Sequence, residues 1–396
     1  MKIIHTSDWH LGQSFYGMER TEEHLAFLSQ LCDTVKVERP DALIISGDIY
    51  DSVAPSLTAQ RLYNKMMLEL HGTLPEMKIV VTAGNHDSSS RLELHSDLWD
   101  AFDVKIVGNI ERTDEGVNYE KHIIEIEGKG YIVAIPYIYQ ANYPATTDGE
   151  QASRMRHFHQ TLLDNVALRN SNNLPVIMTG HLAVSGADIK GHESKSMRLV
   201  YEKLEELGSG YDYLALGHIH HPQFVTHSTN ARYSGSPIPM NFDEEYPHSI
   251  TIVEIESYDT APMVRAQEIA PLVPVITIPE KGGDCNEVVQ CIESLPDSRI
   301  YTRVRLKVND VIPMHERKRI EEAFEGKKAI LCEIQPIREK QEAAESRNLV
   351  IEEMKMISPM EIAADYYEKR FGTAMDSELK AMLEECMDIL EKEEEV

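Results

Sequence analysis

The sequence predicts an α/β fold, and three observations support this prediction. Continuous apolar runs occur at residues 42–46, 77–82 and 175–180, as in strands that a parallel sheet buries on both faces. Amphipathic helical segments alternate with the early runs, which gives the β-α-β-α-β order typical of parallel sheets. Most runs end in Asp, Asn or His, and functional groups gather beyond the carboxyl ends of such strands.

The elements of the first half follow from hydrophobic periodicity. Residues 2–5 form a short β run, and residues 22–39 have helical spacing that Pro40 ends. A second amphipathic helix is expected over residues 58–71. Further strands are expected at residues 122–127, 131–136, 213–217 and 249–256, whereas residues 139–151 are rich in turn formers.

After three prolines at positions 271, 274 and 279, the chain changes character. Five segments predict a small separate β-α-β-α-β domain: residues 273–278, 286–295, 301–308, 314–324 and 329–334. On the strand at 301–308, apolar side chains alternate with Arg303, Arg305 and Lys307. That basic face is either solvated or in contact with phosphate.

Two amphipathic helices are expected at the C-terminal end. Ser358 and Glu361 form a capping-box pattern before a helix that Gly372 ends, and a second helix covers residues 376–394. These helices either pack on their own chain or dock a partner.

Bulk properties narrow the class of protein. A chain of 396 residues is expected to hold more than one domain. Five cysteines without a C-x-x-C pair indicate reduced thiols and a cytoplasmic location, and no apolar run is long enough for a membrane helix. The net charge of -27 argues against nucleic-acid binding. However, 16 acidic and 6 basic residues fall in the last 56, so the charge is uneven.

The strand ends carry a set of nitrogen and oxygen ligands without a thiolate, which suits Mn²⁺, Fe²⁺ or Zn²⁺. The set is Asp8, His10, Asp48, Asn85, His181, His218 and His220. Seven ligands are too many for one catalytic ion and suit two, with Asp48 as the natural bridge. His86 lies next to a ligand, and we interpret it as a group that stabilises charge or protonates a leaving oxygen. Taken singly, each histidine is better explained by a surface or hydrogen-bonded role, so the joint pattern carries the prediction.

The ordered motifs D-x-H, G-D, G-N-H-D, H and G-H-x-H resemble those of the calcineurin-like metallophosphoesterase superfamily. A narrower resemblance, to the SbcD family of nuclease subunits of bacterial SbcCD complexes, covers essentially the whole chain. It is carried by TSDWHLG (6–12), GDIYD (47–51), GNHDSSSRLE (84–93), ALGHIHHPQ (215–223), YSGSPIPMNFDEE (233–245) and SPMEIAADYYEKRFG (358–372).

The resemblance implies a metallophosphoesterase β-sandwich flanked by helices, with a small α/β capping domain and C-terminal helices. The nuclease domain would span residues 1–270, the capping domain 271–340, and helices that bind an SbcC-like ATPase 341–396. Residues 58–71 and 91–102 would build a homodimer. No G-x-x-x-x-G-K-[ST] motif occurs, so any ATP dependence must come from a partner. No membrane partner is expected.

The resemblance also implies a site of two manganese ions. One ion would be held by Asp8, His10, Asp48 and His220, and the other by Asp48, Asn85, His181 and His218. His86 would be the catalytic histidine. Archaeal and eukaryotic relatives place a second catalytic histidine where this chain has Asp51.

The activity implied by the resemblance is 3'-5' exonuclease on duplex DNA ends and endonuclease on single strands and hairpins. It would act with the ATPase in DNA repair, recombination and replication. The alternative is another metallophosphoesterase, acting on nucleotides or small phosphoesters.

Overall fold

The computed structural model describes residues 1–114, 116–145, 151–190, 201–309 and 311–338, together with Tyr367 and Lys380. The chain divides into two compact units, residues 1–337 and 338–396. The helices predicted at 358–371 and 376–394 lie outside the described residues, except for those two positions. Among the described residues, no helix has both the length and the apolar character needed to cross a membrane.

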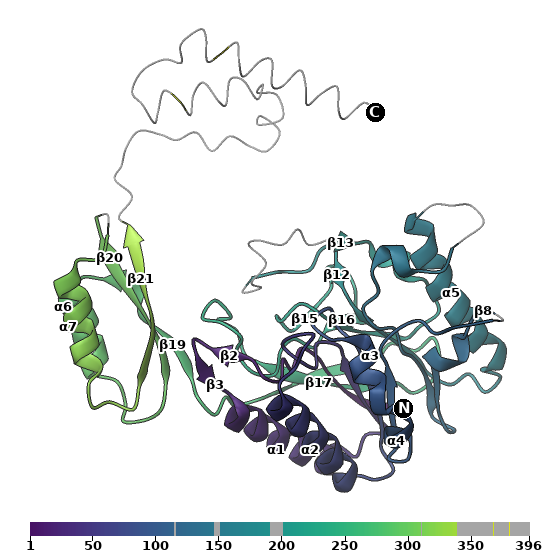
Figure 1. Ribbon diagram of the computed structural model, residues 1–396. Helices are drawn as coiled ribbons and strands as arrows, with labels where there is room; N and C mark the ends of the chain where they lie inside the picture. The colour runs from purple at the N-terminus through teal and green to yellow at the C-terminus, as the bar shows by residue number, and fades with distance from the viewer. Residues whose placement is uncertain are drawn as a thin grey trace. The chain divides into compact units, whose positions relative to one another are not determined.

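The first of two large sheets has six strands and contains the start of the chain. Its order is β18 (Met263–Glu268), β17 (Ser249–Glu254), β1 (Lys2–Thr6), β4 (Ala42–Ser46), β5 (Lys78–Thr82) and β6 (Val104–Val107). Strands β1, β4, β5 and β6 are parallel, and β17 runs antiparallel to β1. Helices α1 (Thr21–Glu38) and α2 (Leu57–Thr73) cover its outer face (Figure 1).

The second large sheet is built in the same way. Its order is β15 (Gln223–Phe224), β16 (Ala231–Tyr233), β14 (Tyr213–Gly217), β11 (Val176–His181), β10 (Gly130–Val133) and β9 (Ile123–Ile126). Strands β16, β14, β11 and β10 are parallel. Helix α5 (Gln151–Arg169) packs on the outer face, where Phe158 and Leu162 are buried.

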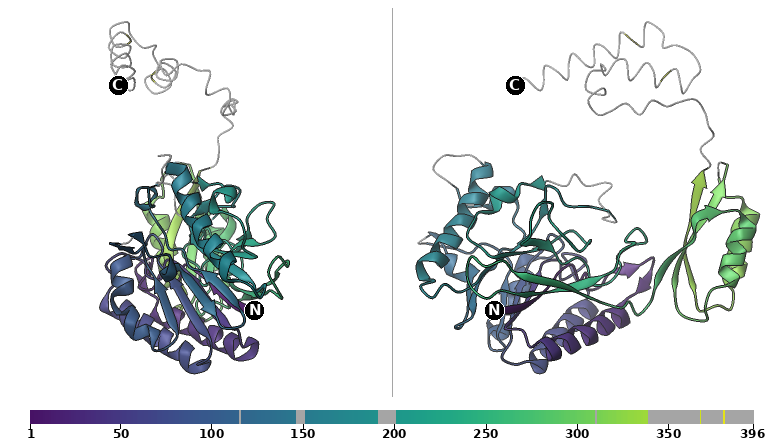
Figure 2. Two further views of the ribbon diagram at one scale, coloured as in Figure 1. Left: turned by 90° about the vertical axis from the view of Figure 1, so that its right-hand side faces the viewer. Right: turned by 180° about the vertical axis from the view of Figure 1, so that it is seen from behind.

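The inner faces of the two sheets pack against each other in one apolar layer. Ile44 and Val80 of the first sheet belong to the same buried cluster as Ile132, Ile177 and Ala215 of the second. The order of layers is therefore helix, sheet, sheet, helix (Figure 2). This confirms the predicted β-sandwich flanked by helices.

A small α/β unit follows, with β19 (Val275–Gly283), α6 (Cys285–Glu293), β20 (Tyr301–Val308), α7 (Met314–Phe324) and β21 (Ile330–Arg338). Its three strands form one sheet in the order β19-β20-β21. Val304, Leu306 and Val308 are buried in one cluster with residues of both helices. The limits of the three predicted domains remain predictions.

The opposite face of this small sheet contacts the sandwich part of the same compact unit. Arg303 is only 2% exposed, and its guanidinium lies 2.7 Å from a carboxylate oxygen of Asp243. Tyr301 stacks on Phe15, and its hydroxyl donates a hydrogen bond to Glu23. The basic face was expected to be either solvated or in contact with phosphate. Neither expectation holds at Arg303, which is buried in an ion pair.

The short elements are β2 (Ser14–Phe15), β3 (Met18–Glu19), α3 (Ser89–Leu92), η1 (Glu93–His95), α4 (Ser96–Asp100), β7 (Arg112–Thr113), β8 (Gly116–Val117), η2 (Tyr119–His122), η3 (Gln140–Asn142), β12 (Ala183–Val184), β13 (Tyr201–Glu202) and η4 (Leu204–Leu207).

Candidate metal centre

The candidate ligands lie where five parallel strands end. Strands β1, β4 and β5 are neighbours in the first sheet, and β11 and β14 are neighbours in the second. Because these strands point the same way within each sheet, their loops emerge at one edge. The structure brings all seven predicted ligands to this edge, in the groups described below.

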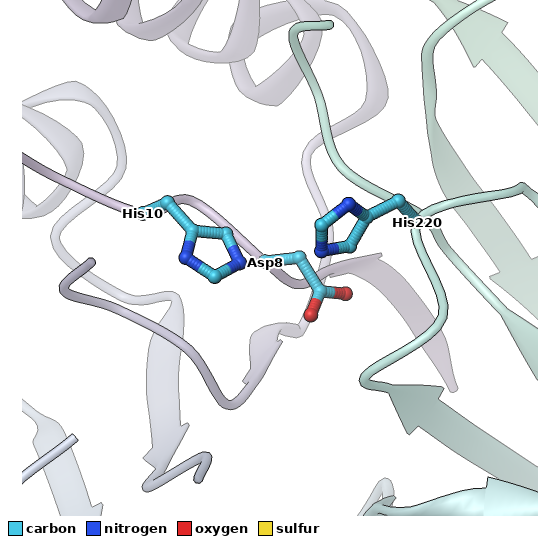
Figure 3. Close-up of side chains that lie close together, drawn as sticks. All are labelled: Asp8, His10 and His220. Atoms are coloured by element: carbon cyan, nitrogen blue, oxygen red, sulfur yellow. The ribbon is translucent and has the colours of Figure 1, made fainter. Parts of the chain in front are cut away.

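The first group combines the N-terminal loop with the loop after β14. Donor atoms of Asp8, His10 and His220 all lie within 4.8 Å of one another, and all three side chains are buried. Figure 3 shows the carboxylate of Asp8 and the two imidazoles gathered around a common point. The two loops come from different sheets, so this group joins the two halves of the sandwich.

The second group contains Asp48, His181 and His218, again with donor atoms within 4.8 Å of one another. The amide oxygen of Asn85 lies 3.0 Å from His181 Nε2 and 2.8 Å from His218 Nδ1. Asp48 Oδ2 is 3.3 Å from His181 Nε2 and 3.6 Å from His10 Nε2. The Asp48 carboxylate therefore stands between the two groups, as a bridging ligand would.

The backbone at these positions adopts positive φ angles, which residues other than glycine rarely do. The φ angles of Asp8, His10, Asp48 and His218 are 54°, 45°, 50° and 96°. Residues in such regions cost of the order of 1–3 kcal/mol each, and they persist only where the surrounding fold holds them. At these four positions the strained turns carry candidate ligands.

Two glycines allow the loops to approach this closely. A Cβ atom on Gly84 would lie 2.1 Å from a carboxylate oxygen of Asp48. On Gly47, which has a φ of 84°, it would lie 2.2 Å from His181 Nδ1. Any larger residue at either position would displace a candidate ligand.

Hydrogen bonds to backbone and carboxylate oxygens fix the orientation of two imidazoles. His181 Nδ1 lies 2.8 Å from the carbonyl oxygen of Ser46, which can only accept, so Nδ1 carries the hydrogen. His220 Nδ1 donates in the same way to Glu244 Oε1 at 2.9 Å. In both rings Nε2 is left to face the site, which is the arrangement of a metal-bound histidine with an outer partner.

Two further side chains that sequence reasoning did not single out support the loops. Asp87 accepts hydrogen bonds from the backbone amides of Ile49, Tyr50 and Gly84, and so ties the loop after β5 to the loop after β4. Ser7 donates a hydrogen bond of 2.5 Å to Asp8 Oδ2. Burial, aided by the nearby Asp48 carboxylate, raises the pKa of Asp87 to about 6.

His86 lies at the open side of the site. Its ring is exposed, its backbone amide donates to Asp48 Oδ1 at 2.9 Å, and its Nδ1 is 2.9 Å from the carbonyl oxygen of Asp51. The Asp51 carboxylate in turn lies 3.5 Å from His10 Nδ1. Asp51 thus contacts both His10 and His86, so its side chain and backbone act on two imidazoles at once.

The electrostatic field of the candidate metal centre favours positive charge. Although burial alone lowers the pKa of His181, the Asp48 carboxylate raises it to about 9. Burial likewise opposes protonation of His220, and Glu244 nevertheless raises its pKa to about 9. Burial also disfavours ionised Asp48, yet His181 and His10 hold the pKa of its carboxyl group well below the usual range.

The donor set fits a bound cation. The neutral form of His181, with its hydrogen on Nδ1, turns the lone pair of Nε2 toward oxygens of Asn85 and Asp48. A cation bound among these atoms would take the place of the proton that the raised pKa of His181 holds on Nε2. His10 Nε2 is buried and makes no hydrogen bond within the described part of the chain. A divalent ion among these atoms would satisfy them, and oxygen with imidazole suits Mn²⁺, Fe²⁺ or Zn²⁺.

Comparison with known families agrees with this geometry. A family model described as calcineurin-like phosphoesterase matches residues 1–222, which include all the loops above. A second model, described as type 5 capsule protein repressor C-terminal domain, matches residues 252–371. The fold and the site thus define a calcineurin-like phosphoesterase.

Within that class, the chain belongs to the SbcD family, the nuclease subunits of SbcCD. The SbcD protein of the Escherichia coli K12 nuclease SbcCD is 32% identical over 292 residues, covering 69% of this chain and 70% of that protein. The corresponding SbcD protein of Bacillus subtilis is 28% identical and covers the whole of both chains. A solved dimetal phosphatase from Danio rerio has a TM-score of 0.39 at 12% identity, covering 68% of this chain and 97% of that one.

Proposed function

We propose that this chain is a metal-dependent nuclease subunit that hydrolyses DNA phosphodiesters. The observation that carries the proposal is the convergence of seven nitrogen and oxygen ligands in two groups that share Asp48, beside the exposed His86. The names of its relatives support DNA as the substrate. The proposed reactions are 3'-5' exonuclease cleavage of duplex ends and endonuclease cleavage of single strands and hairpins.

Two divalent ions, Mn²⁺ in the proposal, would be held by the two groups. Asp8, His10 and His220 would bind one ion, Asn85, His181 and His218 the other, and Asp48 both. Bound there, such a pair activates water and neutralises charge on a phosphate held in line for displacement.

The protein's own residues orient the candidate metal ligands and supply a proton to the leaving oxygen. Glu244 and the Ser46 carbonyl hold the imidazoles of His220 and His181 with Nε2 inward. The carbonyl of Asp51 fixes His86 through Nδ1, so that Nε2 is turned away from this contact. When the ring is protonated, Nε2 donates the proton to the leaving oxygen, and its exposure lets solvent recharge it.

The proposed partners follow the family. Residues 341–396 would bind an SbcC-like ATPase, and residues 1–270 and 271–340 would be the nuclease and capping domains of a cytoplasmic protein that acts in DNA repair, recombination and replication. A homodimer would form through residues 58–71 and 91–102. In support of a dimer, Leu68, Leu94 and Leu98 are exposed apolar side chains in these segments.

The test compares a labelled DNA hairpin with a small chromogenic phosphodiester, both with Mn²⁺. The wild-type protein should cleave the hairpin, and a His86→Ala variant should lose this activity. A matched control is His157→Ala, another exposed histidine of the same domain, which should keep the activity. Turnover of the diester alone would contradict DNA as the substrate and favour a small-ester phosphoesterase.

The partner assignments have separate tests. A chain truncated after Arg338 should keep the nuclease activity and lose the ATPase partner in a pull-down. Recovery of that partner by the truncated chain would contradict the role of the C-terminal residues. Leu98→Asp should convert a dimer to a monomer in light scattering, whereas an unchanged mass would place the interface elsewhere.

A further inference from the structure

A pocket of about 630 Å³ adjoins the candidate metal centre. It shares Gly84, Asn85 and Asp87 with the loop after β5, so one wall of the pocket is also a wall of the metal centre. Its volume lies within the range of small-molecule sites, roughly 300–1,000 Å³. We call it the side pocket. The residues used below are Ser88, Ser90, Asn109, Arg112, Tyr137 and Tyr139.

Aromatic side chains form one wall of the side pocket. Tyr139 is 63% exposed, and its ring lies edge-on to that of Tyr137, with ring centroids 5.1 Å apart. The backbone amide of Tyr137 donates to the carbonyl oxygen of Ala83, which holds this wall against the loop that carries Asn85. An exposed ring on an anchored segment is a surface on which a flat group can stack.

The remaining lining is polar and carries little negative charge. Ser88, Ser90 and Asn109 supply hydroxyl and amide groups, which both donate and accept. Asp87 is the one acidic residue among those that line the pocket, and its oxygens accept three backbone hydrogens. In a chain with a net charge of -27, such a pocket is a place where a polyanion can approach.

Arg112 is the one basic side chain among the residues that line the side pocket. Arg112 donates from Nη2 to the carbonyl oxygen of Asn142 at 2.8 Å, which holds its exposed guanidinium in place. A guanidinium has five N–H donors, and this bond uses one of them. A phosphate is the natural acceptor for the others.

We infer that the side pocket binds the nucleobase of an unpaired nucleotide next to the scissile phosphate, stacked on Tyr139. This inference rests on the nuclease activity proposed above and names the form of DNA that the site takes. A paired base has both faces covered by its neighbours in the duplex, so it can stack on Tyr139 only after it leaves the helix. Hydroxyl and amide groups then meet the base edge, and Arg112 meets the adjoining phosphate.

The test uses end-labelled single strands with Mn²⁺, in which one nucleotide is replaced by an abasic residue. The wild-type protein should cut a bond beside the abasic residue at least about fivefold more slowly than the same bond in the intact strand, the lower end expected for base stacking. Tyr139→Ala should slow cutting of the intact strand by a similar factor, and the abasic residue should then add nothing further.

Tyr139→Phe is the matched control, since it keeps the ring and should keep the discrimination. Equal cutting of intact and abasic strands by the wild type would overturn the inference, as would equal slowing of both by Tyr139→Ala. Inhibition by a deoxynucleoside monophosphate that depends on Tyr139, without any abasic effect, would assign the pocket to the product and also overturn it. If instead the wild type cuts no DNA at all, the proposed function itself fails.

Discussion

Glu244 Oε1 lies 2.9 Å from His220 Nδ1, and the other carboxylate oxygen of Glu244 accepts a hydrogen bond from the amide of Met240. Glu244 is buried, so its position is fixed by the fold and in turn fixes the ring of a candidate ligand. Carboxylates that hold metal-bound histidines in this way set both ring orientation and ligand basicity.

Glu244→Gln should therefore weaken metal binding by roughly 10- to 100-fold, because the amide keeps the shape and loses the charge. Titration of activity against Mn²⁺ measures this effect, and high Mn²⁺ should restore the rate. The control is Glu245→Gln, the neighbouring residue, which is half exposed and pairs with Lys190 and Arg305. Equal Mn²⁺ requirements for the two variants would contradict the positioning role of Glu244.

Asp48→Ala should abolish nuclease activity and remove at least one ion per chain. The reason is that the Asp48 carboxylate lies close to imidazole nitrogens of both groups, 3.3 Å from His181 Nε2 and 3.6 Å from His10 Nε2. Elemental analysis of the purified variant measures the metal content. Asp33→Ala, an exposed carboxylate on α1, is the control. Two ions per chain in the Asp48 variant would refute the bridging role.

Arg303→Met should lower the free energy of unfolding by about 2 kcal/mol, because it removes hydrogen bonds from a buried guanidinium to Asp243 and to the carbonyl of Phe242. Asp243 is half exposed and stays hydrated, which limits the loss. Denaturant unfolding gives the value. Arg299→Met breaks an exposed pair with Glu22 and should cost less than about 1 kcal/mol. Equal losses would mean that the buried contact adds nothing.

The buried imidazole of His159 should make stability depend on pH. Burial lowers its pKa to about 3, well below the value near 6.5 of an unfolded chain. Below pH 6.5 the unfolded state takes up a proton that the folded state refuses, so stability falls as the pH falls toward 3. Within this window, His159 lowers the free energy of unfolding by about 1.4 kcal/mol for each unit by which the pH falls.

Unfolding measured between pH 6 and pH 4 checks this effect. His159→Gln should reduce the pH slope by that amount, whatever its effect on stability at neutral pH. His157→Gln, on the same helix and exposed, should leave the slope unchanged. An unaltered slope in the His159 variant would show that another group governs the acid sensitivity.

Much of the sandwich could be predicted because its central strands are buried on both sides. The centres of runs such as β4 and β5 are apolar, and polar residues follow at their ends, so strand ends and candidate ligands are visible together. Helix α5 was missed although Phe158, Leu162 and Val166 recur at helical spacing, because it follows directly on a turn-rich stretch. Strand β18 was missed because five of its six residues are exposed, which leaves no alternation to detect.

The candidate ligands were accessible from sequence because each follows a strand, whereas their outer partners were not. Glu244 is 24 residues from His220 in the chain, and the contact depends on how a loop folds back after β16. Asp87 lies within a recognised motif, but its three bonds to backbone amides become visible only in three dimensions. The side pocket likewise unites segments that share no local pattern.

The candidate metal centre draws Asp8, His10, Asp48 and Asn85 from one sheet and His181, His218 and His220 from the other. Ions held there would therefore link the two sheets to each other as well as take part in the reaction. Amide protons along the rim of both sheets should exchange more slowly in the loaded protein than in the chelated one, and neither half of the sandwich could cleave a substrate without the other.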